Sequence, residues 1–166
     1  MCQKGTLIFF CGKMGSGKST KSQEMAKEMG AIILSEDEWL SSIYPNEITD
    51  FDSYIKYSMR IKPLLKSHVQ NILNTGISVV MDFPANTKKQ RQWFKDIFLE
   101  HNIPHKLVYI DVDDKLCLKQ IEQRRLTNPD RHNFDTEEVF HHVNSYFQSP
   151  SGDEAFNIEI IDRKNE

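Results

Sequence analysis

Eight residues near the N-terminus, Gly12–Ser19, match the phosphate-binding loop pattern G-x-x-x-x-G-K-[ST] at every position. The apolar run Thr6–Cys11 before them predicts a strand, and Ser19–Met29 after them predicts a helix. Glycines let such a loop curl so that its N–H groups point at phosphate oxygens. Lys18 would then reach the outer phosphates and the Ser19 hydroxyl would bind Mg²⁺. The sequence therefore predicts a nucleoside triphosphate site, contacted by Gly12, Lys13, Met14, Gly15, Ser16, Gly17, Lys18, Ser19 and Thr20.

Three acids, Glu36, Asp37 and Glu38, follow the second predicted strand, Ala31–Leu34, whose end we expect beside the phosphate loop. One well-placed carboxylate can accept the proton of a substrate hydroxyl while its oxygen attacks the γ-phosphorus, and we assign this role to Asp37. Alternatively, Ser35 caps a helix, and the acids favour the helix N-terminus through its dipole. Both interpretations hold together if Asp37 points inward and Glu36 and Glu38 point outward.

A further carboxylate, Asp82, closes the apolar strand predicted over Ile77–Asp82. An apolar strand that ends in aspartate is typical of a Walker B element, whose carboxylate organises Mg²⁺ beside the phosphate loop. We therefore predict that Ser19 and Asp82 bind the metal ion. Alternatively, Asp82 only begins a turn before Phe83 and Pro84.

Three arginines, Arg124, Arg125 and Arg131, flank a proline-containing turn. In a lid over about residues 125–134, they could close over the triphosphate and stabilise charge on the transferring group. We assign catalytic roles to Arg124 and Arg131, together with Lys18, and a nucleotide-binding role to Arg125. Alternatively, these arginines complement the dipole at the C-terminus of a helix.

Strand and helix patterns alternate along the chain, which predicts an α/β fold with one parallel sheet. Short, mostly apolar strands indicate helices on both faces, hence a three-layer αβα sandwich with ligands at the carboxyl ends of the strands. Pro63 is expected to kink or split the helix predicted over about residues 50–74, and the basic run Lys88–Arg91 is interpreted as a solvated first turn. The expected strands are Thr6–Cys11, Ala31–Leu34, Ile77–Asp82, His105–Asp111 and Phe156–Ile161.

The composition indicates one ordinary globular domain: 166 residues, 39% hydrophobic and 27% charged. The formal net charge of −3 argues against a protein that mainly grips nucleic acid. The three cysteines lack metal-site spacing and fit a reducing compartment, with Cys11 and Cys117 in the core. Apolar stretches are too short to span a membrane, and we expect a cytoplasmic protein without a signal peptide.

A known group of kinases shares patterns with the segments Gly12–Thr20, Leu34–Asp37, Val79–Asp82 with Asn86, Leu107–Asp111, Arg124–Arg125, Phe147–Pro150 and Phe156–Ile160. Across nearly its whole length the chain resembles the small P-loop kinases of the polynucleotide-kinase-like, zeta-toxin and chloramphenicol-phosphotransferase type, often catalogued as AAA-type ATP-binding domains. The resemblance implies a P-loop NTPase core of adenylate-kinase-like type, ATP and Mg²⁺. It also implies an aspartate base at Asp37 and lid arginines at or near Arg124.

Two positions depart from the nucleic-acid members of this group, which commonly carry arginine where this chain has Leu40 and Gln120. We therefore interpret residues 1–166 as a single kinase domain that moves the γ-phosphate of ATP to a hydroxyl of a small-molecule acceptor. The acceptor pocket would be lined by the Trp39–Tyr57 region and the loop after Asp82. The alternatives are a polynucleotide 5′-hydroxyl kinase and a nucleotide-dependent switch or ATPase with a protein partner. The sequence shows no base-reading element of the N/T-K-x-D type that would separate ATP from GTP.

Overall fold

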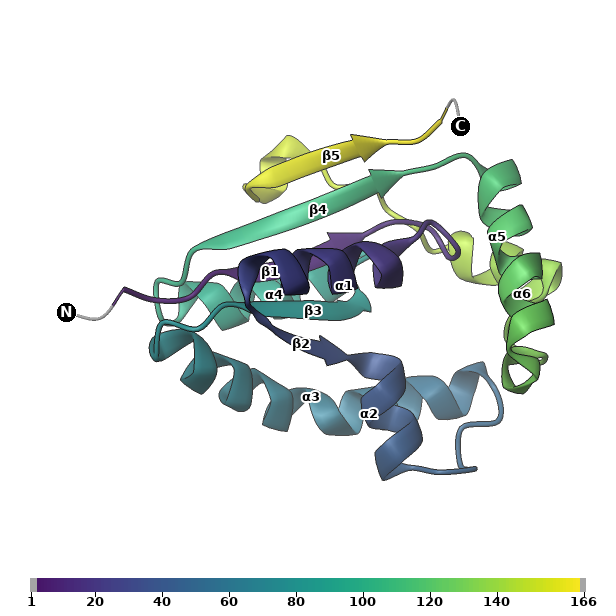
Figure 1. The fold of residues 1–166 in the computed structure, drawn as a ribbon, viewed down its shortest axis with the longest axis horizontal. Helices are drawn as coiled ribbons and strands as arrows, with labels where there is room; N and C mark the ends of the chain where they lie inside the picture. Colours follow the sequence, from purple (N-terminus) through teal and green to yellow (C-terminus); the bar gives the residue numbers. More distant parts are fainter. Residues whose placement is uncertain (1–2, 165–166) are drawn as a thin grey trace.

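The computed structural model describes residues 3–164 and contains one five-stranded sheet (Figure 1). Neighbouring strands pair in parallel, in the order β2-β3-β1-β4-β5. The carboxyl ends of the strands therefore meet at one edge of the sheet, which confirms the predicted α/β fold. The strands are β1 (Leu7–Cys11), β2 (Ile32–Ser35), β3 (Val79–Pro84), β4 (His105–Asp111) and β5 (Ile158–Asp162).

The helices follow the expected pattern, and they include the helix directly after β2 that Ser35 was expected to cap under the alternative interpretation. They are α1 (Lys18–Met29), α2 (Glu36–Ile43), α3 (Phe51–Asn74), α4 (Lys88–Leu99), α5 (Asp114–Thr127) and α6 (Glu137–Asn144), with the 3₁₀ turns η1 (Pro129–Arg131) and η2 (Gly152–Glu154). α3 runs through Pro63 without a break, so the expectation of a split helix was wrong. Pro63 leaves the carbonyl of Met59 without its intrahelical partner. Both residues are exposed, so water can satisfy that group.

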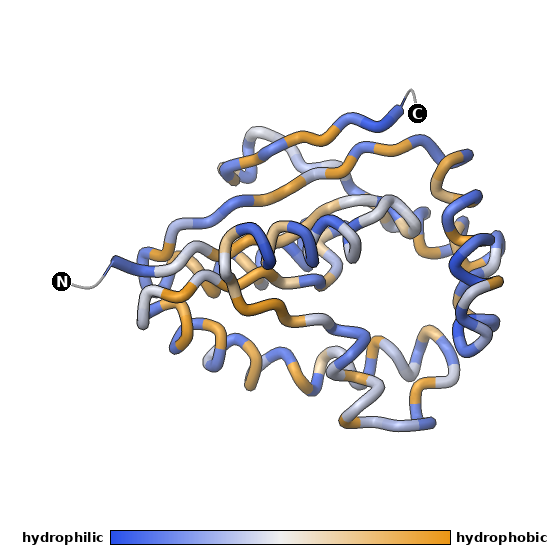
Figure 2. The backbone as a smooth tube through the Cα atoms, viewed as in Figure 1, coloured by the Kyte–Doolittle hydropathy of each residue, from blue (hydrophilic) through white to orange (hydrophobic). Residues whose placement is uncertain are grey.

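The two faces of the sheet bury separate apolar clusters. Because side chains alternate along a strand, Leu7, Phe9 and Cys11 of β1 pack into one cluster with α3 and α4. Ile8 and Phe10 pack into a second cluster with side chains of α1, α5 and α6. Figure 2 shows the resulting pattern, in which apolar residues concentrate along the central strands and the helices are mixed. This arrangement confirms the predicted αβα sandwich.

The cysteines lie where the sequence placed them, as far as the structure describes them. Cys11 and Cys117 are buried free thiols, and burial raises the pKa of Cys11 to about 12. Cys2 lies outside the described residues. None of the helices within residues 3–164 has the length and apolar character that a bilayer crossing requires.

The strand order corrects one expectation about the site. β3, not β2, lies next to β1, and β2 pairs with the far side of β3. The crossover from β1 through α1 to β2 leaves a gap of one strand, which β3 fills later in the chain. The acids after β2 therefore begin one strand further from the phosphate loop than expected, and α2 brings them back toward it.

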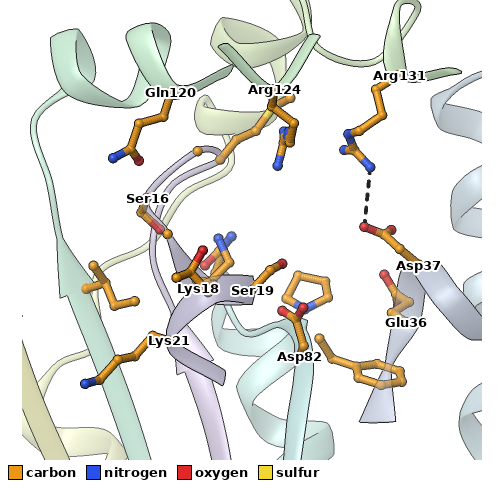
Figure 3. Close-up of a pocket in the computed structure, with 18 of the residues that line it drawn as sticks. Ser16, Lys18, Ser19, Lys21, Glu36, Asp37, Asp82, Gln120, Arg124 and Arg131 are labelled. Atoms are coloured by element: carbon orange, nitrogen blue, oxygen red, sulfur yellow. Dashed lines mark ion pairs between the residues drawn. The ribbon is translucent and has the colours of Figure 1, made fainter. Parts of the chain in front are cut away.

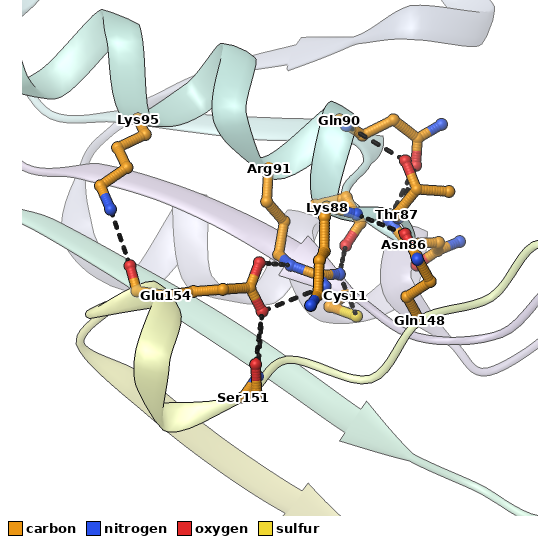
Figure 4. Close-up of polar contacts among 11 residues, drawn as sticks. Cys11, Asn86, Thr87, Lys88, Gln90, Arg91, Lys95, Gln148, Ser151 and Glu154 are labelled. Atoms are coloured by element: carbon orange, nitrogen blue, oxygen red, sulfur yellow. Dashed lines mark hydrogen bonds and ion pairs between the residues drawn. The ribbon is translucent and has the colours of Figure 1, made fainter.

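A buried arginine ties α4 to the segment before β5 (Figure 4). Arg91 was interpreted as part of a solvated first turn, but its side chain is fully buried. It donates to the Glu154 carboxylate through Nε at 2.8 Å and Nη2 at 3.2 Å, and to the Ala85 carbonyl at 2.9 Å. The expectation was wrong because Glu154, the partner that permits this burial, lies 63 residues away in the sequence.

Candidate active site

The connection from β1 to α1 forms the phosphate loop, and its backbone favours glycine at two positions. Gly15 and Gly17 have φ angles of 78° and 98°, in the left-handed region. A Cβ on Gly15 would also lie 2.6 Å from the carbonyl oxygen of Cys117. Within residues 3–164, no side chain caps α1, and its first turn carries no acid. The free N–H groups and the positive end of the helix dipole can therefore receive an anion.

Lys18 folds back over this loop. Its Nζ donates to the carbonyl oxygens of Gly12 at 2.5 Å and Lys13 at 3.1 Å, and burial lowers the pKa of its ammonium group. The side-chain oxygen of Asn86 accepts a hydrogen bond from the Gly12 N–H at 2.9 Å. The connection between β3 and α4 thus holds the start of the loop, while Thr87 caps α4.

Asp82 lies inside β3 and not at its end, so both the strand boundary and the turn interpretation were wrong. Pairing with β1 skips Asp82 and Phe83 and resumes at Pro84, an irregularity of the kind that re-aims side chains next to sites. Burial raises the pKa of Asp82, whereas a hydrogen bond from Ser19 and the charge of Lys18 lower it. The structure therefore brings Ser19 and Asp82 together beside the loop (Figure 3).

Ser35 caps α2 and places Asp37 in the first turn of this helix, so the capping interpretation is confirmed. The Ser35 hydroxyl accepts a hydrogen bond from the Glu38 N–H at 3.4 Å. The Asp37 side chain is 70% exposed and faces the space above the phosphate loop (Figure 3). Ser35 thus caps the same helical turn from which Asp37 lines the site.

Glu36 points inward, which is the opposite of the expectation. It is only 3% exposed, and its carboxylate accepts hydrogen bonds from the Ser58 hydroxyl at 2.8 Å and from the Tyr54 hydroxyl. Burial raises the pKa of Glu36. Tyr54 and Ser58 stand four residues apart on α3, a spacing that puts both hydroxyls on the face toward α2. The spacing of Tyr54 and Ser58 was the signal in the sequence that could have identified them as two hydroxyl donors to one carboxylate.

Two of the lid arginines, Arg124 and Arg131, converge on one buried carboxylate. Arg124 donates to both oxygens of Asp135, from Nε at 2.8 Å and from Nη2 at 2.6 Å. Arg131 donates from Nε to the same carboxylate at 2.9 Å, and its Nη1 lies 3.5 Å from Asp37 (Figure 3). Asp135 is 1% exposed. The role of Asp135 could not be predicted from the sequence, because its partners become apparent only when α5, η1 and α6 pack together.

A cavity of about 980 Å³ lies above the phosphate loop. The predicted residues that line it are Met14, Gly15, Ser16, Gly17, Lys18, Ser19, Thr20, Asp37, Asp82, Arg124 and Arg131. As the described residues define it, Gly12, Lys13 and Arg125 are not part of its wall. Lys13 instead pairs with Asp114 at 2.7 Å.

Arg163 also lines this cavity, although the sequence did not single it out. Arg163 follows β5 and donates from Nη1 to the Ser16 carbonyl at 3.2 Å. The rule that ligands bind at the carboxyl ends of parallel strands could have pointed to Arg163, because it directly follows the last strand.

A second cavity, of about 870 Å³, adjoins the first. It lies between α2, the start of α3 and the lid. Six residues line both cavities: Met14, Asp37, Tyr54, Asn128, Arg131 and Val143. The expected contribution of the Trp39–Tyr57 region is present, whereas Phe83, Pro84 and Asn86, after Asp82, line the first cavity only.

Comparison with protein families gives one match: a family model described as an AAA domain covers residues 7–150. The chain belongs to this AAA domain family. The match spans the phosphate loop, Asp37, Asp82 and the lid segment. A comparison of this chain with curated protein sequences found no match.

Solved structures share the fold of this AAA domain at low sequence identity. A presumed kinase from Chloroflexus aurantiacus superposes with a TM-score of 0.75 at 17% identity, over 98% of this chain and 87% of that one. The Mycobacterium tuberculosis APS kinase, solved with AMPPNP and APS, has a TM-score of 0.65 at 18% identity, over 98% and 91%. Chaetomium thermophilum Kti12 with ADP-AlF3 has a TM-score of 0.68 at 14% identity, over 96% and 90%. The AAA domain therefore has the fold of small P-loop kinases, as expected.

Proposed function

We propose that the protein is an ATP-dependent phosphotransferase that moves the γ-phosphate to a hydroxyl of a small molecule. The observation that carries this proposal is the position of Asp37. Its carboxylate lies where the cavity above the phosphate loop meets the second cavity. A group at this boundary can touch both the transferred phosphate and the molecule that receives it.

The phosphate loop would hold ATP by its outer phosphates. The first residues of α1, Lys18, Ser19 and Thr20, line the first cavity, and no side chain caps this helix within residues 3–164. On ATP binding, the Lys18 ammonium would exchange the carbonyl oxygens of Gly12 and Lys13 for phosphate oxygens, which are stronger acceptors.

Ser19 and Asp82 suit Mg²⁺, because a hydroxyl and a carboxylate oxygen are the ligands that this hard cation prefers. Among the residues that the structure describes, no group of three or more His, Cys, Asp or Glu forms a metal cage. Such a sparse set fits Mg²⁺, which usually keeps water and substrate phosphates as its other ligands. The bound ion would neutralise charge on the phosphates.

The acceptor hydroxyl would enter from the second cavity. Its oxygen forms a bond to the γ-phosphorus, the bond between that phosphorus and the β–γ bridging oxygen breaks, and ADP leaves. The hydroxyl proton passes to Asp37. Arg124 and Arg131 face the same space and would stabilise the charge spread over the transferring group.

The second cavity favours phosphoryl transfer over the role of a switch with a protein partner. A switch needs no cleft for an acceptor beside the nucleotide, whereas a kinase does. The second cavity, of about 870 Å³, is large enough for a small molecule, and Asp37 is part of its wall.

Replacing Asp37 by asparagine tests the proposal. Transfer of labelled γ-phosphate to a panel of alcohols, sugars, nucleosides and a 5′-hydroxyl oligonucleotide should fall about 10²–10⁴-fold, with ATP affinity retained. Asp52→Asn, which removes an exposed acid at the start of α3 outside both cavities, serves as the matched control. Unchanged transfer in Asp37→Asn would contradict the role of this carboxylate.

A further inference from the structure

The two cavities differ in the chemistry of their walls. The first carries five cationic side chains, Lys18, Lys21, Arg124, Arg131 and Arg163, against four acids, Glu24, Glu36, Asp37 and Asp82. Cations therefore outnumber acids there, which suits a triphosphate. Apolar and aromatic residues make up ten of the seventeen that line the second cavity, among them Leu40, Tyr44, Ile48, Phe51, Tyr54 and Phe134.

Charge in the second cavity opposes an anion. Among the described residues that line it, Arg131 is the only cation, and its guanidinium is already held by Asp135 at 2.9 Å and faces Asp37 at 3.5 Å. The other charged lining residues are acids: Asp37, Glu38 and Asp130. A phosphate or carboxylate placed here would meet like charges and no spare cation, which is unfavourable in a partly desolvated site.

Aromatic side chains of the wall contact other aromatic rings. Tyr44 lies at a tilt against Tyr57, a residue outside the cavity wall, with ring centroids 4.2 Å apart, and Phe51 lies at a tilt 6.1 Å from Tyr54. Tyr54 is held further by its hydrogen bond to the buried carboxylate of Glu36. A preformed aromatic surface of this kind recognises an apolar body at little cost in side-chain entropy.

We infer that the acceptor is a hydroxyl compound with an apolar body and without phosphate or carboxylate groups. It lies in the second cavity with its hydroxyl at Asp37. This inference rests on the proposed function. It excludes nucleotides and 5′-hydroxyl polynucleotides as acceptors, because their own phosphates would enter the acidic cavity together with the hydroxyl.

A binding experiment tests the inference independently of catalysis. Saturation-transfer NMR on protein loaded with AMPPNP would compare benzyl alcohol with hydroxymethylbenzoate, which adds one carboxylate. Benzyl alcohol should bind, and the carboxylate should bind at least about tenfold more weakly. Ile48→Asp, which charges the cavity wall, should weaken benzyl alcohol binding by a similar factor. Ile43→Asp, an exposed position on α2 outside the cavity, should leave it unchanged. Equal or tighter binding of the carboxylate, or no effect of Ile48→Asp, would overturn the inference.

A transfer experiment separates this inference from the proposed function. With labelled ATP, thymidine and benzyl alcohol would be compared with thymidine 3′-phosphate and hydroxymethylbenzoate. Transfer to thymidine or benzyl alcohol, with transfer to the matched anionic compound at least about tenfold slower, supports both the acceptor class and the kinase function. Efficient transfer to an anionic member overturns the acceptor class and leaves the kinase function standing. Failure of every compound while AMPPNP and benzyl alcohol still bind would contradict the proposed function instead.

Discussion

The carboxylate of Asp135 accepts three hydrogen bonds and is almost fully buried. It accepts two from Arg124 and one from Arg131, and it is 1% exposed. Breaking a buried ion pair costs more than its formation contributes, because the remaining charges are left without a partner. The geometry of both lid arginines therefore depends on this carboxylate.

Asp135→Asn should reduce the free energy of unfolding by about 1–3 kcal/mol, because a neutral amide replaces the charged acceptor. ATP-dependent phosphate transfer should fall as well, since Arg124 and Arg131 lose their common anchor. Urea denaturation and a transfer assay would measure the two effects. Asp130→Asn changes an exposed acid of the same segment and should stay within about 0.5 kcal/mol of the parent. Stability of Asp135→Asn equal to that of this control would contradict the anchoring role.

Glu36 makes stability depend on pH in a defined direction. Burial raises its pKa above the ordinary value of 4.5, so above that pH the folded state binds more protons than the unfolded state. The contribution of Glu36 is then fully present below 4.5 and is lost as the pH rises through the folded-state pKa. Glu36→Gln cannot ionise and should lack this loss. The free energy of unfolding of the variant, minus that of the parent, should increase with pH above 4.5; a difference that stays constant from pH 4 to 8 would contradict the assignment.

At the scale of elements, the pairing of Arg91 with Glu154 joins α4 to η2 and so to β5. Arg91→Met keeps most of the side-chain volume but leaves Glu154, whose side chain is 12% exposed, without its partner. We expect the free energy of unfolding to fall by about 3–5 kcal/mol. Lys89→Met, at an exposed position of the same helix, is the matched control for urea denaturation. Equal effects of the two variants would show that the buried pair contributes little.

Gly15 decides whether the phosphate loop can form beside α5. A Cβ at this position would meet the Cys117 carbonyl at 2.6 Å, and the φ angle of 78° is strained for alanine. Gly15→Ala should lower ATP affinity by at least about tenfold and have a smaller effect on the strands. Titration with a fluorescent ATP analogue would measure the affinity, and far-ultraviolet circular dichroism would monitor the fold. Unchanged affinity would mean that the loop tolerates the side chain.

For the molecule as a whole, ATP binding should raise thermal stability, because a ligand that binds only the folded state stabilises it. At an ATP concentration of about 100 times Kd, the gain should be about 2.7 kcal/mol, observable as a rise in Tm. Asp37→Asn should keep the rise, and Lys18→Ala should lose most of it. A full rise in Lys18→Ala would contradict the assignment of Lys18 to the phosphates.

The sequence predicted the alternation of strands and helices, because each strand appears as a short apolar run and glycines mark helix ends. It also predicted eleven of the residues that line the first cavity, since the loop, Asp37 and Asp82 each follow or lie in an apolar strand. Strand order could not be predicted in this way, because it depends on which strand fills the gap beside β1. The roles of Glu36, Arg91 and Asp135 were not predicted from the sequence, for a related reason. Each becomes meaningful only through partners that other elements bring into contact.

The shared carboxylate of Asp135 has a thermodynamic consequence. Arg124 faces the first cavity, Arg131 faces both, and a single side chain holds the two guanidinium groups. A ligand that moves one arginine therefore shifts the other. ATP and the acceptor should not bind independently, and linkage requires the coupling to be reciprocal. Whatever factor ATP applies to the affinity of the acceptor, the acceptor must apply to the affinity of ATP.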